Sequence, residues 1–390
     1  MKIALVHDWL TGYRGGERVL HHLAKRFPGA DLFTLFHEPG SVSPEIEDRR
    51  IFTSPLDAFP GKTAHYRKLL PLFPLAIRQF DLRGYDLILS TSHAVAKSIR
   101  VPAGTRHVDY CFTPMRYIWD QADAYLGHGP SRWLARPVVE ALRRFDVRTA
   151  GPSSVTRFVA ISTEVEHRIK RHYGREAKVV APPVDSSWID FDGQSADDFY
   201  LLVGGFVPYK REALVIEAFR RSNRRLIVVG DGPGRESLEA RATSKIEFVG
   251  RVDDRELAQY YRRARALIYP QREDFGLVAV EAQAAGRPVI AFGAGGALDT
   301  VRPLPETPDY TPDYSQHHSK DVEPTRFGPT GIFFHEPSPD ALAEAIERFE
   351  KFEAYFDPGQ IRRWAMRFSP QRFDEEFDRE IAAAMRIERP

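Results

Sequence analysis

The chain has 390 residues, of which 43% are hydrophobic and 28% are charged, and these proportions exclude a fibrous or largely disordered protein. Its 55 Lys and Arg residues nearly balance its 54 Asp and Glu residues, so no global basic field favours nucleic acid as a partner. Cys111 is the single cysteine, which excludes an intramolecular disulfide and favours a reducing compartment. The length predicts two domains.

The N-terminal stretch Met1–Leu10 has His7 and Asp8 within a short apolar run, which argues against a secretory signal peptide. No segment has 18 uninterrupted apolar residues, so the sequence predicts no membrane-spanning helix. We therefore expect a cytoplasmic protein.

Short apolar runs alternate with segments of helical period in the first half of the chain, which is typical of βαβ units with a parallel sheet. Lys2–Val6 reads as a buried strand, followed by a Gly-bearing turn and an amphipathic helix. A later helix is expected to have Thr163 as its N-cap and to end at Gly174. The other strands expected here contain the runs DLFTLF, DLILSTS, RHVDYC and RFVAIS.

The stretch Ala181–Asp198 is rich in Pro, Ser and Asp and has neither helical nor strand periodicity. We therefore interpret it as an interdomain linker. After it the order strand, Gly-bearing turn, helix begins again. We predict an α/β protein of two Rossmann-like domains that face each other across a cleft, with ligands bound beyond the strand ends. The expected domains are 1–185 and 195–369, with a C-terminal helix at 370–390 packing back on the first domain.

The segment Arg302–Thr330 interrupts this order with a long, Pro-rich stretch, and loops of this length are usually functional or disordered. We interpret it as an ordered flap over the cleft, and a mobile surface insertion is the alternative. The residues that favour a flap are Tyr310, Tyr314, His317 and His318.

Turns at two predicted strand ends are suited to binding an anion. Gly15 and Gly16 precede the first helix, where glycine permits close backbone approach and the helix N-terminus offers free N–H groups. In the second half Lys210 and Arg211 follow a strand, and paired cations there suit a diphosphate. A plain tight turn and a solvated helix start are the respective alternatives. Weaker turns of the same kind lie at Gly230 and at Arg251–Val252.

The stretch Arg272–Ala282 places Glu273 just before a predicted helix and Glu281 one and a half turns inside it. Carboxylates accept hydrogen bonds from sugar and ribose hydroxyls, and the N–H groups of the first helical turn suit phosphate. The alternative is that Glu273 caps the helix while Glu281 has a partner in the core. The residues that supply the N–H groups are Phe275, Gly276, Leu277 and Val278.

Aromatic, basic and acidic residues near the predicted cleft in the first half form a possible carbohydrate platform. His93 and Lys97 lie four residues apart after a strand, although a lone histidine is more often structural. The platform candidates are Asp8, Trp9, Arg116, Tyr117 and Trp119.

The segment Lys62–Phe80 has four basic residues around a Leu, Phe and Pro core, which suits an anionic membrane surface. Pro71 and Pro74 break any single amphipathic helix, and an ordinary packed loop is the alternative.

These motifs resemble glycosyltransferase family 4, whose members are retaining enzymes of GT-B fold that use nucleotide-diphosphate sugars. EDFGLVAVE resembles the family's Glu–seven residues–Glu signature, and VPYKR and VGDGPG are also similar. SHAVAK, TPMRYIWD and YGREAKVVAPPVD resemble most the bacterial mannosyltransferases of O-antigen and exopolysaccharide assembly.

The resemblance implies a retaining hexosyltransferase that moves mannose from GDP-mannose to a glycan or lipid-linked acceptor, with no metal and no other cofactor. The first domain would bind the acceptor and the second the nucleotide sugar. Lys210, with Arg211, would hold the diphosphate, which Gly15 and Gly16 would line. Glu273 would bind the donor sugar, Glu281 the ribose, and Arg251–Val252 would lie near the base.

Two positions depart from the family pattern: Gly205 replaces a usual Arg and Phe112 a usual His, for which His93 is the candidate replacement. These departures leave open a non-catalytic nucleotide-sugar-binding partner in a polysaccharide assembly complex. A nucleotide-sugar epimerase of the same two-domain architecture is a further alternative.

Overall fold

The computed structural model describes residues 1–120, 130–193, 195–305 and 327–387, without the side chains of 63, 64, 67, 130–135 and 208. The chain divides into two compact units, one formed by Met1–Pro183 with Phe373–Pro390 and the other by Val184–Arg372. The flap predicted around Tyr310, Tyr314, His317 and His318 lies outside the described residues.

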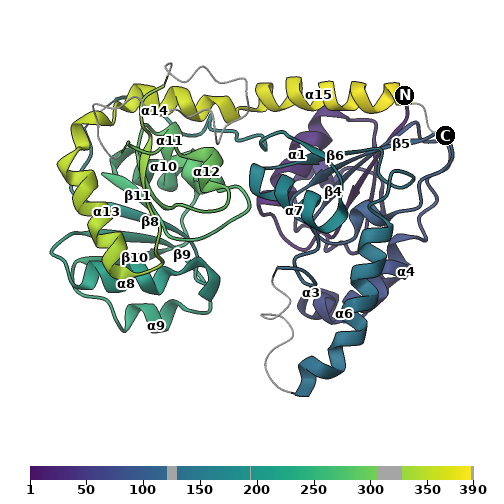
Figure 1. The fold of residues 1–390 in the computed structure, drawn as a ribbon, viewed down its shortest axis with the longest axis horizontal. Helices are drawn as coiled ribbons and strands as arrows, with labels where there is room; N and C mark the ends of the chain where they lie inside the picture. Colours follow the sequence, from purple (N-terminus) through teal and green to yellow (C-terminus); the bar gives the residue numbers. More distant parts are fainter. Residues whose placement is uncertain (121–129, 194, 306–326, 388–390) are drawn as a thin grey trace. The chain divides into compact units, whose positions relative to one another are not determined.

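The first unit is built on a parallel sheet whose described strands have the order β3-β2-β1-β4-β5-β6-β7 (Figure 1). In β1, His7 pairs with Thr34 of β2 on one side and with Thr91 of β4 on the other. The strand order reverses between β1 and β4, and such a switch point is where open α/β sheets bind ligands. The strands are β1 (Ile3–His7), β2 (Asp31–Thr34), β3 (Ile51–Thr53), β4 (Leu87–Ser92), β5 (Arg106–Cys111), β6 (Arg157–Ala160) and β7 (Ala177–Val179).

The helices of this unit begin and end close to the turn signals of the sequence. Ser162, not Thr163, is the N-cap of α7: its Oγ accepts from the Val165 N–H at 3.2 Å, so the predicted cap was one residue late. Gly174 ends the helix in the left-handed region with φ of 64°, as predicted. The helices are α1 (Gly15–Arg26), α2 (Pro44–Glu47), α3 (Lys62–His65), α4 (Phe73–Ile77), α6 (Pro130–Arg148), α7 (Thr163–Tyr173) and α15 (Pro370–Arg386), with the 3-10 turns η1 (Pro55–Ala58), η2 (Tyr66–Leu72) and η3 (Ala96–Ser98).

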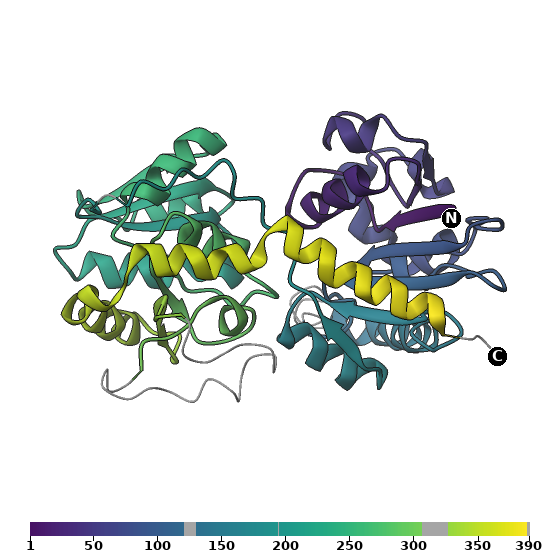
Figure 2. The ribbon, with the colours of Figure 1, turned by 90° about the horizontal axis from the view of Figure 1, so that it is seen from above.

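The C-terminal helix α15 lies beside α1 in the first unit (Figure 2). His22 Nε2 of α1 is 2.8 Å from Asp374 Oδ1, and the rings of Phe373 and Phe377 pack edge-on against Tyr110 of β5. The first turns of α15 thus pack against the sheet of the unit in which the chain begins.

The second unit has a parallel sheet in the order β10-β9-β8-β11-β12-β13, and its switch point lies between β8 and β11. Together the two sheets confirm the predicted pair of Rossmann-like domains. The strands are β8 (Tyr200–Gly205), β9 (Leu226–Asp231), β10 (Ile246–Gly250), β11 (Ala266–Tyr269), β12 (Val289–Phe292) and β13 (Gly331–Phe334). The helices are α8 (Glu212–Arg220), α9 (Arg235–Glu239), α10 (Asp254–Arg263), α11 (Leu277–Ala284), α12 (Ala297–Thr300), α13 (Pro339–Lys351) and α14 (Pro358–Ala365), with η4 (Pro208–Lys210), η6 (Glu353–Tyr355) and η7 (Met366–Phe368).

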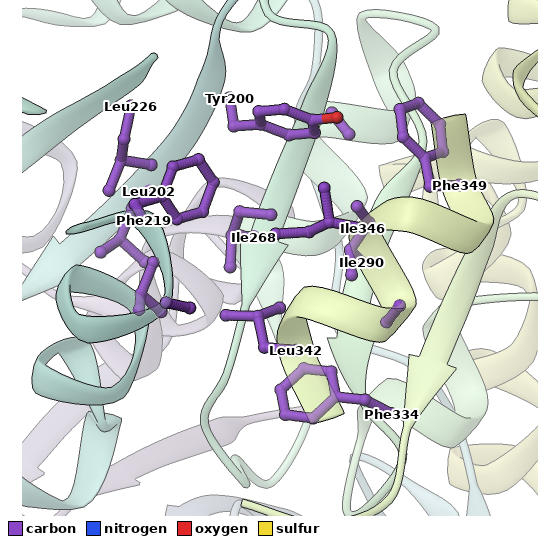
Figure 3. Packing of buried hydrophobic residues seen from close by; sticks show 14 of the residues in the cluster. Tyr200, Leu202, Phe219, Leu226, Ile268, Ile290, Phe334, Leu342, Ile346 and Phe349 are labelled. Atoms are coloured by element: carbon purple, nitrogen blue, oxygen red, sulfur yellow. The ribbon is translucent and has the colours of Figure 1, made fainter. Parts of the chain in front are cut away.

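Helices α8 and α13 contribute to the core of the second unit. Figure 3 shows Leu342 and Ile346 of α13 beside Ile268 and Ile290 of the sheet, and Phe219 of α8 belongs to the same cluster. These five side chains are at most 2% exposed, so apolar contacts hold α8 and α13 against β11 and β12 of the sheet.

Two buried polar clusters lie inside the first unit. In the first, Lys97 and Asp146 form an ion pair of 2.8 Å in which neither side chain is more than 1% exposed. The other Asp146 oxygen accepts from Trp119 Nε1 and from the Tyr173 hydroxyl, each at 2.8 Å. Asp146 of α6 therefore connects η3, α7 and the segment after β5.

In the second cluster, Ser90 links His107 to Asp109. His107 Nδ1 is 2.7 Å from the Ser154 carbonyl oxygen, which only accepts, so this nitrogen carries a proton. Ser90 Oγ lies 2.7 Å from His107 Nε2 and 2.5 Å from Asp109 Oδ1, and it has one proton to donate. A further proton must sit on Asp109 or on His107 Nε2, because otherwise two lone pairs would face each other.

We expect this cluster to make stability depend on pH. Burial raises the pKa of Asp109 from 3.8 to about 7, against the opposing hydrogen bonds of Ser90 and Ser92. Because the pKa of Asp109 is higher in the folded than in the unfolded chain, the protonated carboxyl stabilises the folded state fully below pH 3.8. This contribution, up to about 4 kcal/mol, is lost as pH rises through about 7. Asp109→Asn should therefore flatten the fall in melting temperature between pH 5 and pH 8.

The control for this thermal-unfolding series is Asp340→Asn, because the Asp340 side chain is 81% exposed. An unchanged pH slope in Asp109→Asn would mean that the carboxyl titrates alike in the folded and unfolded chain.

Candidate functional site

A cation and a carboxylate meet at the switch point of the second unit. Lys210 follows β8, Glu273 follows β11, and Lys210 Nζ lies 3.0 Å from Glu273 Oε1. The Tyr269 hydroxyl donates to Glu273 Oε2 at 2.8 Å. Burial lowers the pKa of Lys210, but Glu273 raises it more, so the net direction is upward and the amine stays charged. The sequence predicted both members of the pair but not the tyrosine that holds the carboxylate.

The loop from Glu273 to α11 requires glycine where it turns. Gly276 has φ of 101°, and a Cβ there would lie 2.7 Å from the Tyr269 hydroxyl oxygen. The Ala279 N–H bonds back to the Gly276 carbonyl. The N–H groups of Leu277 and Val278 precede that bond, in the turn where helical amides lack intrahelical partners. The predicted phosphate-binding amides thus belong to a real helix start.

The Phe275 side chain, by contrast, has a packing role in this loop. It is 4% exposed and its ring lies 5.6 Å from that of Phe368. Gly296 approaches the Phe275 backbone so closely that a Cβ would lie 2.3 Å from its Cα. The Gly296 N–H also donates to the Glu273 carbonyl at 2.8 Å, so this turn holds the loop in place.

Glu281 has a partner in the core, which was the alternative to a ribose contact. The residue is 5% exposed, and the Tyr261 hydroxyl of α10 donates to its Oε2 at 2.9 Å. Tyr261 was not predicted from the sequence, although a buried carboxylate one helix away signals the need for a donor. The ribose contact of Glu281 stays a prediction.

The neighbours of Lys210 differ in what they contribute. Arg211 is, among the described residues, the one non-glycine with positive φ, at 59°, and its guanidinium lies 4.4 Å from the centre of the Phe292 ring. Burial raises the pKa of Glu212 to about 7, and sequence reasoning missed this buried carboxyl beside the site. Gly205 is the last residue of β8. A Cβ at this position would lie 3.6 Å from the Asp231 carbonyl oxygen, which is an ordinary contact distance.

The backbone conformation by itself explains why a glycine stands at position 230. Its φ is 131°, and a Cβ there would lie 1.8 Å from the Gly204 carbonyl oxygen of the neighbouring strand. The close approach of β8 and β9 therefore excludes every other residue, and the donor contact predicted for Gly230 stays a prediction. Arg251 is 82% exposed, with Nε 3.9 Å from Asp231 Oδ2, and Val252 follows it after β10.

At the switch point of the first unit, Asp8 holds the loop that follows β4. Its fully buried carboxylate accepts the N–H groups of His93 and of residues 94–96 at 2.7–2.9 Å. Burial raises the pKa of Asp8, but His93 and these amides outweigh it and lower the pKa to about 2. Both oxygens thus have backbone partners, and the acceptor contact predicted for Asp8 stays a prediction.

His93 and its aromatic neighbours form one wall of this switch point. His93 Nδ1 lies 3.1 Å from Asp8 Oδ2, and its side chain is 20% exposed. The Trp9 ring packs edge-on at 4.4 Å between centroids and is 5% exposed, so Trp9 has a packing role, and its carbohydrate contact stays a prediction. The Phe112 ring lies 6.4 Å from that of His93, so the two positions compared in the sequence lie close together.

The start of α1 is closely packed beside this wall. A Cβ at Gly16 would lie 3.3 Å from the Phe112 ring, which favours glycine there. Glu17 accepts the Arg14 N–H at 3.0 Å and lies 3.9 Å from His7 Nε2. An acidic residue already occupies the first turn that follows Gly15, and the diphosphate contact of these glycines stays a prediction.

Trp119 contacts residues of α6 and α7. The His172 ring stacks on it at 4.4 Å, and the Arg143 guanidinium lies 5.1 Å from the ring centre. Arg116 and Tyr117 are half-buried in the same segment. The carbohydrate contact of these three residues stays a prediction, and the structure adds a packing role for Trp119.

The segment 62–80 forms three short helices, as Pro71 and Pro74 predict, rather than one amphipathic helix. The Lys62 side chain is partly buried, and its Nζ donates a hydrogen bond to the His37 carbonyl at 2.7 Å. Leu72 and Leu75 are exposed by 45% and 68%. Among the described helices none is long and apolar enough to cross a membrane, and the described part of the chain has no cluster of three metal-ligating side chains.

Comparison with known proteins agrees with this arrangement. Residues 190–306 match the family model of glycosyl transferases group 1, which covers less than half of the chain. An uncharacterized glycosyltransferase of Methanocaldococcus jannaschii is 28% identical over 179 residues, covering 45% of this chain and 50% of that protein. The O-antigen chain mannosyltransferase C of Escherichia coli is 29% identical over 307 residues, covering 73% of this chain and 76% of that protein.

Two solved structures show that the fold is GT-B. Anabaena HepE in complex with UDP has a TM-score of 0.68 at 17% identity, covering 98% of this chain and all of that chain. Sucrose-phosphate synthase from Thermosynechococcus elongatus has a TM-score of 0.69 at 19% identity, with 98% and 100% coverage. The sequence match and the fold together support a glycosyltransferase.

Proposed function

We propose that this protein is a retaining hexosyltransferase of glycosyltransferase family 4 that moves mannose from GDP-mannose to a glycan or lipid-linked acceptor. The observation that carries the proposal is the Lys210–Glu273 pair at the switch point of the second sheet. A cation beside a carboxylate that a tyrosine orients suits the two halves of a nucleotide sugar, diphosphate and hexose. The likeness to an O-antigen mannosyltransferase supports mannose and a role in cell-surface polysaccharide synthesis.

In the proposed reaction the bond from the anomeric carbon to the diphosphate breaks, and a bond to the acceptor oxygen forms on the same face. The acceptor proton passes to the leaving phosphate oxygen, so the nucleoside diphosphate is the second product. Negative charge grows on the diphosphate in the transition state, where Lys210 and the amides of Leu277 and Val278 would stabilise it. Glu273 would bind donor-sugar hydroxyls and Glu281 the ribose.

Two other functions use the same donor site without transfer. A non-catalytic binding partner in a polysaccharide assembly complex would bind the nucleotide sugar and release nothing. A nucleotide-sugar epimerase would change the sugar without an acceptor. The departures at Gly205 and Phe112 are the observation that keeps the binding partner as an alternative, and the shared two-domain architecture is what the epimerase rests on.

The test is a panel of GDP-mannose, GDP-glucose, UDP-glucose and UDP-galactose, each first in a thermal-shift assay, since a ligand that binds the native state raises the melting temperature. The donor that binds is then incubated with a lipid-linked or free glycan acceptor, and release of nucleoside diphosphate is measured. Acceptor-dependent release of GDP from GDP-mannose, with an α-linked product, supports the proposal. Binding without release or transfer favours the binding partner instead.

Contact with an anionic membrane through 62–80 belongs to the same proposal, on the cytoplasmic face where a lipid-linked acceptor is reached. The support is the exposed pair Leu72 and Leu75 in a segment without acidic residues. Flotation with vesicles of anionic lipid, compared with vesicles of zwitterionic lipid, tests it. Equal or no binding to both would remove the membrane contact and leave the transferase proposal intact.

A further inference from the structure

The His93 imidazole is held from one side by a carboxylate that the fold keeps ionised. Asp8 is fully buried, and its two oxygens accept four backbone N–H groups from the loop that carries His93. Four donors of this kind stabilise the charged carboxylate, and they keep it in place when the side chains around it move.

This environment determines which nitrogen of His93 carries the proton. An ionised carboxylate only accepts hydrogen bonds, so Nδ1, at 3.1 Å from Asp8 Oδ2, must be the donor. A neutral imidazole has one N–H group, and Nε2 is then left with a lone pair. Asp8 thus selects the tautomer of His93 as well as its orientation.

The His93 ring packs against aromatic neighbours but is not fully buried. Trp9 packs edge-on against it at 4.4 Å, while the His7 and Phe112 rings lie 6.3 Å and 6.4 Å away. The side chain is 20% exposed although Nδ1 faces a residue with no exposed surface. The position is the switch point between β1 and β4, where a parallel sheet binds its ligand.

We propose that Asp8 is a positioning residue that fixes His93 with Nε2 as the acceptor for a hydroxyl of a sugar substrate, a role that rests on the proposed function. A hydroxyl is the matching donor, because it gives one proton and needs no charge on the imidazole. The pair would set the place of one hydroxyl relative to the reacting carbon, so its effect falls on turnover of a correctly bound sugar.

Two variants separate this role from a structural one. In His93→Asn the side-chain amide takes the place of Nδ1 and preserves the contact with Asp8. The variant has no atom in the place of Nε2, so it loses the proposed acceptor. Asp8→Asn offers an N–H group to Nδ1, which moves the ring proton to Nε2 and turns the acceptor into a donor. We expect each to lower kcat/KM for transfer by about 10- to 100-fold, with the double variant no worse than either.

The readouts are chosen so that failure here differs from failure of the proposed function. Nitrogen-15 NMR of the full chain with labelled histidine, assigned by His93→Asn, should show a protonated Nδ1 in the wild type and a protonated Nε2 in Asp8→Asn. Affinity for GDP should stay within about twofold, because none of the proposed GDP contacts involves His93 or Asp8. Wild-type kcat/KM in His93→Asn, or an unprotonated Nδ1 in the wild type, would overturn the inference.

If Asp8→Asn does not fold, His93→Asn and the wild-type spectrum still decide the matter. If no donor on the panel is transferred by the wild type, the proposed function fails, and the NMR result then reports on the Asp8–His93 pair alone.

Discussion

Replacing Lys210 by Ala should lower kcat for sugar transfer by about 100- to 1,000-fold while weakening GDP binding by no more than about tenfold. The ion pair with Glu273 at 3.0 Å keeps the amine charged and in place before the donor binds. The amine would interact most strongly with the charge that develops on the leaving diphosphate, so its removal costs more in the transition state than in the ground state. Steady-state kinetics and calorimetric GDP titration measure the two quantities.

The matched control is Lys245→Ala, which removes an exposed lysine from the same unit. A further variant, Lys210→Arg, keeps the charge and should retain more activity than Lys210→Ala. Equal losses in kcat and in GDP affinity would contradict a role for Lys210 in the transition state.

The second large effect concerns stability: Lys97→Met should lower the free energy of unfolding by about 3–5 kcal/mol. Both members of the ion pair are buried, so removing the amine leaves the Asp146 carboxylate without its counter-charge in the protein interior. Asp146 would keep its hydrogen bonds from Trp119 and Tyr173, which do not replace a full charge. Urea unfolding, followed by circular dichroism, measures the loss.

An exposed pair in the same unit is the control for this prediction. Arg144 and Glu140 are 75% and 50% exposed, and Arg144→Met should change the unfolding free energy by less than about 1 kcal/mol. Adding Asp146→Asn to Lys97→Met should recover part of the loss, because Asn has no charge to leave unpaired. A loss of similar size in Lys97→Met and Arg144→Met would show that burial does not strengthen the pair.

The placement of the donor site was accessible to sequence reasoning because parallel strands bring their carboxyl ends to one edge. Lys210 and Glu273 are 63 positions apart, yet each follows a recognisable apolar strand, and the structure places them in contact. The tyrosine partners of Glu273 and Glu281 were not accessible, because a hydroxyl partner depends on side-chain direction across two elements. Tyr269 ends a strand and Tyr261 lies in α10, and neither position has a local signal of its contact.

The first unit shows the opposite case, in which the sequence did not reveal how deeply the candidate residues are buried. Asp8, Trp9 and Lys97 were selected as polar or aromatic residues near a strand end, but all three are at most 5% exposed. Residue type and spacing do not reveal burial when a loop folds back over a strand end, as the loop after β4 does over Asp8.

The sequence by itself determined the two parallel-sheet domains and the strand ends that the candidate site residues follow. Alternation of apolar runs, glycine turns and amphipathic helices is local, and it suffices to specify repeated βαβ units. Only the tertiary structure decided which carboxylates are free for a ligand and which hold the fold together. Glu273 is paired with a cation and remains partly exposed, while Asp8 is saturated by backbone amides in the interior. The difference depends on long-range contacts, because the solvation of a carboxylate is set by everything that packs around it.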